Sequence, residues 1–316
     1  MVADLRVRLG GLELRNPFLL ASGIWGESGV SLAGAWKAGA GAVVTKSIGS
    51  TPRAGYPNPT IETYDRWGML NAMGLPNPGI AEYPREIAAA LDAGATVIGS
   101  VFGGGPEEFA SLAEQIAATG VSAVELNLSC PHAEGYGAEV GGTPEAVGGI
   151  VRAVCRAVRV PVIAKITPNT SDPAALAVAA ERAGAAAVSA INTLRGLAID
   201  VRLRRPVLSH GMGGLSGPAI KPVGLACVWQ IAEKVSVPVL GIGGISTAED
   251  ALEYLMAGAT AVQIGTAVAF EGVGVFGRLP LELSALLNRL GLPSVAASVG
   301  AARPGKDAGR RTAQGR

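Results

Sequence analysis

The chain has 316 residues, of which 49% are hydrophobic and 45 are glycine, and its formal net charge is +1. This composition excludes a disordered chain, and the small net charge gives no reason to expect binding to nucleic acid or to an anionic membrane. Three cysteines, none in a CxxC spacing, argue against a disulfide framework, a structural zinc or an iron–sulfur cluster and are typical of a cytoplasmic protein. We expect neither a signal peptide nor a membrane-spanning helix, because no basic region precedes an apolar one and no apolar run reaches ~18 residues.

Short apolar runs alternate with helix-like segments along the chain. The runs 5–9 and 12–14 flank Gly10-Gly11, which predicts a β-hairpin. Eight candidate strands follow at 18–21, 42–45, 96–101, 123–127, 162–165, 187–191, 237–241 and 261–264. The helix-like segments are 31–38, 80–93, 106–119, 144–157, 173–183, 220–235, 247–257 and 279–290. Eight buried parallel strands separated by helices predict a single α/β domain over residues 1–300, a (β/α)8 TIM barrel whose base the hairpin plugs. A doubly wound open sheet is the alternative.

Two connections are longer than the usual loops of about 2–6 residues. Residues 47–79 link the second strand to its helix, and residues 192–219 link the sixth strand to its helix. Both begin at carboxyl ends of strands, where barrel enzymes form their active sites. The basic tail, 301–316, lacks large apolar residues, so we expect it to be disordered.

Polar residues gather where the predicted strands end. Lys46, Asn127, Lys165 and Asn192-Thr193 each follow or close a strand, and Cys130 comes just after Asn127. The carboxyl ends of barrel strands open onto one face, so we expect these side chains to meet. Buried lysines need an anionic partner, and amides suit a ring with alternating carbonyl and N–H groups, such as a pyrimidine.

Glycine-rich turns follow the seventh and eighth strands, at Gly243-Gly244 and Gly265-Thr266. Glycine lets backbone N–H groups approach an anion closely, and these two loops often bind phosphate in barrels. The pattern predicts a phosphate site, which a phosphorylated substrate or flavin mononucleotide would fill equally well.

The remaining cysteines and the two histidines give weaker signals. Cys155 and Cys227 lie within helix patterns, where a free cysteine acts as a small hydrophobe. A metal site formed by Cys130, His132 and His210 lacks any recognised ligand spacing. We therefore expect no metal.

The combined motifs resemble the dihydroorotate dehydrogenase family over roughly residues 5–290. The segments that carry the resemblance are Asn16-Pro17 with Ala21-Ser22-Gly23, Thr45-Lys46-Ser47, Asn71 to Asn77, Asn127-Leu128-Ser129-Cys130-Pro131, Lys165 to Asn169, Ile191-Asn192-Thr193 and Gly213 to Gly217. The resemblance implies a (β/α)8 barrel that binds one flavin mononucleotide (FMN) and oxidises (S)-dihydroorotate to orotate in pyrimidine (UMP) synthesis. Cys130 would remove the C5 proton while hydride passes from C6 to flavin N5, and Lys165 would stabilise the anionic reduced flavin.

The other site residues follow from the same resemblance. The substrate would contact Lys46, Asn71, Met73, Gly74, Leu75, Asn127, His132, Asn192 and Thr193. The flavin nucleotide would contact Ala21, Ser22, Lys46, Ser47, Ser100, Asn127, Lys165, Ile191, Gly217, Gly243, Gly244, Gly265 and Thr266. Two positions depart from the family pattern, because His132 and Ser100 stand where asparagine is usual.

Cysteine at position 130 points to the cytosolic class, and the run from Ile191 to Gly196 favours its NAD-linked form. In that form a homodimer of catalytic subunits binds partner subunits that carry FAD and a [2Fe-2S] cluster, giving a heterotetramer. A fumarate-reducing homodimer fits equally well. Three rival functions are a dihydropyrimidine dehydrogenase, which His132 suggests, a cysteine hydrolase using Cys130 and His210, and a non-catalytic phosphate-binding barrel.

Overall fold

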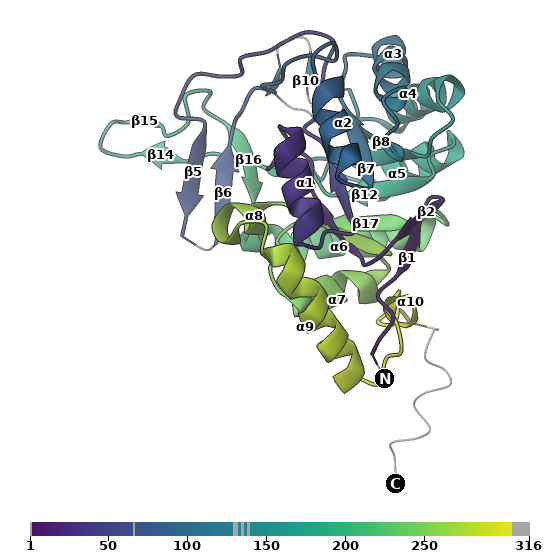
Figure 1. Cartoon of the computed structure of the whole chain (residues 1–316). Helices are drawn as coiled ribbons and strands as arrows, with labels where there is room; N and C mark the ends of the chain where they lie inside the picture. Colours follow the sequence, from purple (N-terminus) through teal and green to yellow (C-terminus); the bar gives the residue numbers. More distant parts are fainter. Residues whose placement is uncertain (1, 66, 129–131, 134–135, 138–139, 305–316) are drawn as a thin grey trace.

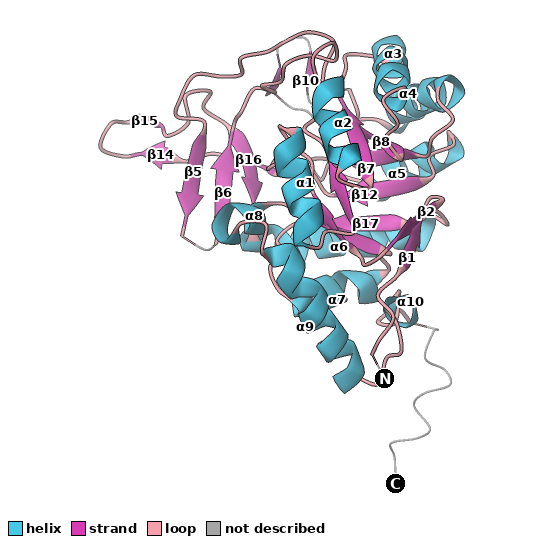
Figure 2. Ribbon diagram, viewed as in Figure 1, coloured by secondary structure: helices cyan, strands magenta, loops and turns pink. Residues whose placement is uncertain are grey.

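The computed structural model describes residues 2–65, 67–128, 132–133, 136–137 and 140–304, with only the backbone placed at 132, 133, 136 and 137. Eight parallel strands close into a barrel in the order β11-β12-β17-β18-β3-β4-β7-β8, with helices around it (Figures 1 and 2). These strands are β3 (Phe18–Leu20), β4 (Ala42–Val44), β7 (Val97–Val101), β8 (Ala123–Asn127), β11 (Val162–Ile166), β12 (Ala187–Ala190), β17 (Val239–Ile242) and β18 (Ala261–Ile264). The predicted TIM barrel is confirmed, and the open sheet is excluded.

The helices begin where the sequence provides caps. Thr143 accepts a hydrogen bond from the Ala146 N–H at 3.3 Å, and Thr247 forms a capping box with Asp250. Such caps satisfy N–H groups that have no partner within the helix. The barrel helices are α1 (Gly29–Ala38), α2 (Pro84–Asp92), α3 (Pro106–Ala117), α4 (Pro144–Ala157), α5 (Pro173–Arg182), α6 (Lys221–Lys234), α7 (Ala248–Ala257) and α9 (Val275–Arg289). The described residues also form three short helices, η1 (Pro218–Ile220), α8 (Thr266–Glu271) and α10 (Val295–Ser298).

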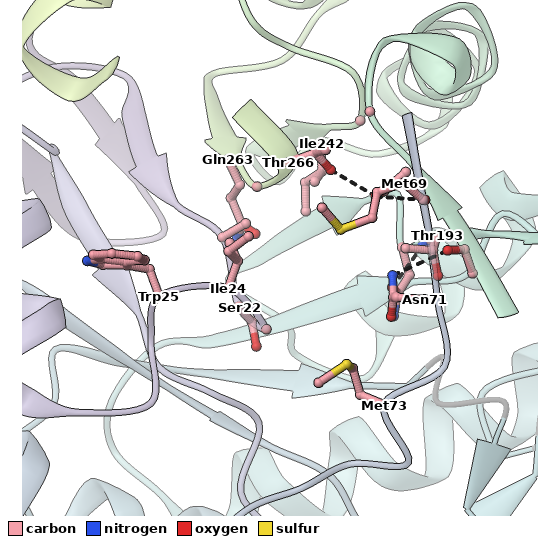
Figure 3. A pocket seen from close by; sticks show the side chains of 18 of the residues that line it. Ser22, Ile24, Trp25, Met69, Asn71, Met73, Thr193, Ile242, Gln263 and Thr266 are labelled. Atoms are coloured by element: carbon pink, nitrogen blue, oxygen red, sulfur yellow. Dashed lines mark hydrogen bonds between the residues drawn. The ribbon is translucent and has the colours of Figure 1, made fainter. Parts of the chain in front are cut away.

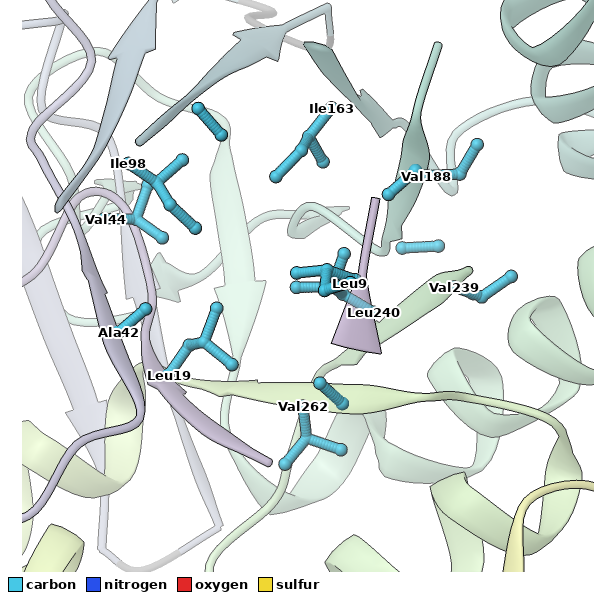
Figure 4. Close-up of a cluster of buried hydrophobic side chains, with 14 of the residues drawn as sticks. Leu9, Leu19, Ala42, Val44, Ile98, Ile163, Val188, Val239, Leu240 and Val262 are labelled. Carbon is cyan, nitrogen blue, oxygen red and sulfur yellow. The ribbon is translucent and has the colours of Figure 1, made fainter. Parts of the chain in front are cut away.

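The barrel interior is filled by aliphatic side chains (Figure 4). The N-terminal hairpin, β1 (Val7–Leu9) paired with β2 (Leu12–Leu14), contributes Leu9, which is 1% exposed. A Cβ at Gly10 would lie 3.0 Å from the Ala186 carbonyl oxygen, just before β12. The hairpin therefore lies against the amino-terminal end of the barrel, where the sequence places a plug.

The two long insertions form one sheet, which periodicity did not predict. The first insertion supplies β5 (Ile61–Tyr64) and β6 (Gly68–Asn71), and the second supplies β13 (Leu194–Gly196) and β16 (Gly213–Ser216). The strand order β13-β16-β6-β5 joins them, with β16 antiparallel to β6. The second insertion also carries the short pair β14 (Ile199–Asp200) and β15 (Arg205–Pro206), which projects from the barrel (Figure 1). A further pair, β9 (His132–Ala133) and β10 (Tyr136–Gly137), follows β8.

The first residues of the predicted tail pack against the barrel helices. Arg303 donates hydrogen bonds to the carbonyl oxygens of Trp229 and Ala257 at 3.3 Å, and its guanidinium lies 5.3 Å from the centre of the Trp229 ring. The predicted tail is thus attached to α6 and α7 as far as Arg303, and residues 305–316 lie outside the described residues. Among the described helices, none is both long and apolar enough to cross a membrane.

Candidate active site

A cavity of about 1090 Å³ opens at the carboxyl ends of the barrel strands. Figure 3 shows Asn71, Met73 and Thr193 on one side and Ser22 and Trp25 on the other. The predicted site residues that line it are Ala21, Ser22, Lys46, Ser47, Asn71, Met73, Gly74, Leu75, Asn127, Lys165, Ile191, Asn192, Thr193, Gly217, Gly243, Gly244, Gly265 and Thr266. Residues predicted from nine separate segments are therefore brought to one cavity, while their individual roles remain predictions.

A chain of amides orders one wall of this cavity. Asn127, at the end of β8, donates to the Ser47 hydroxyl at 3.1 Å and accepts from the Asn192 amide at 3.2 Å. Asn192 in turn accepts the Thr193 N–H at 2.8 Å, and Asn71 donates to the Gly214 carbonyl at 3.3 Å. These bonds fix the amide orientations, since each amide has distinct donor and acceptor ends. The wall thus presents donors and acceptors in fixed places, as recognition of a polar ring requires.

Three serines meet beside the amides. The Ser22, Ser47 and Ser100 hydroxyls lie 2.9–3.3 Å from one another. Ser100 is fully buried and, unlike the other two, is not among the residues that line the cavity. Its short side chain reaches Ser22 and Ser47 and supports them from behind, and its role toward the flavin stays a prediction.

Two lysines bring positive charge to the cavity. Lys46 pairs with Glu27 at 2.8 Å, and Lys165 pairs with Glu125 at 3.6 Å between Nζ and Oε1. Both lysines are buried, so each requires such a partner to remain charged. Glu27 is exposed and lines the cavity, whereas Glu125 lies inside the barrel at 0% exposure.

The glycine turns after β16, β17 and β18 also line the cavity. Gly217 and Gly244 have φ values of +91° and +70°, a backbone region that favours glycine. A Cβ at Gly217 would lie 2.7 Å from the Gly68 Cα, and one at Gly244 would lie 2.8 Å from the Lys221 Cβ. Only glycine therefore fits these turns, and the backbone stays open toward the cavity.

Neighbouring side chains hold these turns in place. The Tyr254 hydroxyl donates to the Gly243 carbonyl at 2.7 Å, and burial raises the pKa of Tyr254 well above its usual range, so this donor stays protonated. The Thr266 hydroxyl donates to that of Ser216 at 2.8 Å. Burial lowers the pKa of Lys221, but hydrogen bonds to Asp250 and Glu253 outweigh it and raise that pKa, so Lys221 remains a cation beside the turns.

The arrangement fits FMN, the cofactor that the sequence resemblance implies. The glycine turns leave backbone exposed where a phosphate would lie, and η1, which leads into α6, has no side-chain N-cap. Gln263 lines the cavity, and its buried Oε1 has no hydrogen-bond partner, so it can accept from a ring N–H. FMN requires exposed backbone N–H groups for its phosphate, which the glycine turns offer. Its ring requires a hydrogen-bond acceptor and a nearby cation, which Gln263 and Lys165 offer.

Sequence reasoning missed several cavity residues and one residue beneath them. Glu27, Gln263, Trp25 and Phe270 line the cavity, and Glu125 contacts Lys165 from inside the barrel. Glu125 and Gln263 are isolated polar residues within apolar strands, and that interruption is a signal that could have found them. Trp25 and Phe270 carry no such signal, because single aromatic residues in loops are common.

Cys130, the predicted base, lies outside the described residues, and so does the side chain of His132. Cys227 is buried and Cys155 is half-buried, and burial raises the pKa of both thiols, as expected for structural cysteines. His210 stacks on Tyr56 with ring centroids 3.9 Å apart and is not one of the described residues lining the cavity. Within the described part of the chain, no group of three or more His, Cys, Asp or Glu side chains is arranged to hold a metal ion.

Fold and site together define a barrel enzyme with a combined nucleotide and ring pocket. A sequence model of the family named dihydroorotate dehydrogenase matches residues 4–287. The catalytic subunit of dihydroorotate dehydrogenase B (NAD(+)) from Thermococcus kodakarensis is 51% identical over 301 residues, which cover 95% of this chain and 99% of that protein. The proteins of the same name from Pyrococcus furiosus and Methanocaldococcus jannaschii are 50% and 48% identical, covering 95% and 90% of this chain and 99% and 94% of their own lengths. The chain therefore belongs to the dihydroorotate dehydrogenase family.

Proposed function

We propose that this chain is an FMN-dependent, NAD-linked dihydroorotate dehydrogenase catalytic subunit, which oxidises (S)-dihydroorotate to orotate in pyrimidine synthesis. The observation that carries this proposal is the convergence of Lys46, Asn127, Lys165 and Asn192 on one cavity that ends in a glycine cradle. Relatives whose printed name is dihydroorotate dehydrogenase B (NAD(+)), catalytic subunit, cover nearly the whole chain and support the same function.

The reaction removes two hydrogens from adjacent ring carbons and leaves a C5–C6 double bond. Bound FMN supplies the acceptor for the hydride that leaves C6. Cys130 takes the C5 proton, and a thiol can do so only if it is ionised or assisted at the moment of transfer. Asn71, Asn127 and Asn192 hold the pyrimidine through their amides, and Lys165 supplies positive charge at the base of the cavity.

A partner for the further electron path is supported by the printed name of the relatives, which calls them catalytic subunits. The chain itself has only three cysteines and no CxxC spacing. We propose a cytoplasmic homodimer of this chain that binds subunits carrying FAD and [2Fe-2S], which pass electrons to NAD. Trp25 and Phe270 support this, since both line the cavity yet are 48% and 45% exposed. Aromatic side chains are enriched at protein interaction surfaces.

The purified protein tests the proposal directly. We expect a bound flavin whose absorbance bleaches under anaerobic conditions when dihydroorotate is added and not when dihydrouracil is added. Bleaching by dihydrouracil alone would assign the chain to the dihydropyrimidine dehydrogenases instead. Absence of flavin after purification and after supply of FMN would contradict the proposal as a whole.

NAD linkage requires a separate measurement. The chain alone should pass electrons from dihydroorotate to an artificial dye but not to NAD, and NAD reduction should appear when an iron–sulfur FAD subunit is co-expressed. Fast NAD reduction by the isolated chain would refute the need for a partner. Rapid turnover with fumarate would instead support the alternative acceptor.

A further inference from the structure

A small polar cluster lies inside the barrel, beneath the cavity. It consists of Glu125 on β8, Lys165 on β11, Ser189 on β12 and Gln263 on β18, all of them buried. The rest of the described interior is largely aliphatic (Figure 4). A fully buried carboxylate is strongly unfavourable unless charges and hydrogen bonds compensate it. Glu125 therefore requires a reason beyond packing.

The contacts of Glu125 divide between its two oxygens. Oε2 accepts from the Ser189 hydroxyl at 3.0 Å and from the Gln263 Nε2 at 2.6 Å. Oε1 has no hydrogen-bond partner and lies 3.6 Å from the Lys165 Nζ. Two neutral donors thus hold one oxygen of the carboxylate, and the other oxygen points toward a cation.

Lys165 connects this cluster to the cavity. It lines the cavity and is paired across the strands with Asn127 and Ser189. Among the described residues, Glu125 is the acid that forms an ion pair with it. The ammonium therefore lies between a buried carboxylate and the cavity, so its charge toward the cavity is partly offset.

Gln263 contacts the Glu125 carboxylate and also lines the cavity. A carboxylate only accepts hydrogen bonds, so the amide must direct its N–H toward Glu125 and its Oε1 away. That Oε1 is buried without a partner, and Gln263 lines the cavity. The side chain thus links the position of Glu125 to an acceptor available at the cavity.

We propose that Glu125 is a positioning residue that holds Lys165 at the base of the cavity and lowers the reduction potential of the bound flavin. The inference rests on the proposed binding of FMN. A negative charge at Glu125 offsets part of the lysine's attraction for electrons on the flavin ring. Without it, the same lysine would favour the reduced flavin more strongly.

The test is the midpoint potential of FMN bound to the holoenzyme. Glu125→Gln keeps the size of the side chain and an acceptor for Ser189 but removes the charge. We expect the reduced flavin to gain about tenfold in binding relative to the oxidised form, which is about 30 mV more positive for a two-electron couple. Ser189→Ala is the matched control, because it removes a hydrogen bond to the same carboxylate without changing charge, and its potential should stay near the parent value.

An unchanged or more negative potential in Glu125→Gln would overturn the proposal. An equal positive shift in Ser189→Ala would also overturn it, since packing and not charge would then be the cause. Failure of the parent protein to hold FMN would instead refute the proposed function. The two outcomes differ because a midpoint potential can be measured only when FMN is bound.

A second measurement is the unfolding temperature of flavin-free protein. It remains informative if the single variant Glu125→Gln fails to fold. Lys165→Met should lower the unfolding temperature, because it leaves Glu125 buried without its cation. Adding Glu125→Gln to Lys165→Met should recover part of that loss. A double variant no more stable than Lys165→Met would show that the two residues are not coupled.

Discussion

Asn127 organises the candidate active site at the scale of single residues. It closes β8, contacts Ser47 from the first insertion and Asn192 from the loop after β12, and lines the cavity itself. One amide thereby fixes the geometry of three segments that are distant in sequence. The same residue lies three positions before Cys130, so the strand that positions the amide also leads into the segment carrying the proposed base.

Cys130→Ala should retain flavin and lose turnover by about 100-fold to 10,000-fold, the usual contribution of a general base. Steady-state oxidation of dihydroorotate at neutral pH, with flavin content measured from absorbance, checks this. Cys155→Ala is the control, because burial raises the pKa of that half-buried thiol and keeps it unreactive. Equal activity in Cys130→Ala and the parent would refute the assignment of the base.

Pairing of the two insertions is the decisive feature at the scale of elements. Their common sheet brings Asn71 at the end of β6 against Gly214 on β16, and Gly214 against Thr193. Two of the predicted substrate contacts, Asn71 and Thr193, therefore depend on a sheet built from segments more than a hundred residues apart. Local sequence predicts each insertion but not their pairing.

Gly214→Ala should weaken substrate binding while leaving the flavin in place. A Cβ at Gly214 would lie 2.1 Å from the Thr193 Oγ1 and 2.7 Å from its Cβ, so Thr193 must move. We expect KM for dihydroorotate to rise about tenfold, equivalent to about 1.4 kcal/mol. Gly196→Ala in the same sheet is the control, since its Cβ would lie 3.1 Å from the flexible end of Leu70 and at an ordinary 3.6 Å from the Leu215 Cβ. A similar KM in both variants would contradict this role of Gly214.

Gly244→Ala should abolish flavin retention, and Gly291→Ala should not. The two glycines have nearly the same φ, +70° and +68°, so each alanine has a similar backbone cost of about 1–2 kcal/mol. At Gly244 the new Cβ would also lie 2.8 Å from the Lys221 Cβ, whereas nothing lies within 4 Å at Gly291. Flavin content and unfolding temperature measure the difference, and equal effects would exclude a specific role for the turn.

Two buried tyrosines, Tyr83 and Tyr254, make the stability of the whole molecule depend on pH. Tyr83, the residue before α2, donates a hydrogen bond to the Gly26 carbonyl. Tyr254 on α7 donates one to the Gly243 carbonyl. Burial raises the pKa of both above the ordinary value of 10.0. A raised pKa in the folded state favours the protonated form, so the contribution to stability is complete below pH ~10 and is lost as the pH rises above it.

We therefore expect the free energy of unfolding to fall above pH ~10 by about 1.4 kcal/mol per pH unit for each of these tyrosines. Denaturant titrations between pH 8 and 11 check this. Tyr83→Phe and Tyr254→Phe should each flatten the decline above pH ~10, because phenylalanine cannot ionise in the unfolded state. A slope identical to that of the parent would show that neither hydroxyl carries the dependence.

At the level of the whole chain, much of the architecture was predictable from the sequence. The strands 123–127 and 261–264 and the helix 144–157 have the predicted bounds, because apolar runs and the Thr143-Pro144 cap are local signals. The helix expected at 279–290 begins at Val275 instead, and Pro280 lies inside α9. Packing of Phe276 and Leu279 in the core stabilises the additional turn.

The sequence by itself determined the number and order of the barrel units and placed the polar residues at the strand ends on one face. It did so because strand periodicity, helix caps and glycine turns are local, and because polar residues at strand ends share one face in a barrel. Only the tertiary structure decided the pairing of Lys165 with Glu125, the position of Ser100 behind Ser22 and Ser47, and the sheet that joins the two insertions. Those contacts join residues 40 to 147 positions apart, and their choice depends on the closed geometry of the barrel, which no local pattern encodes.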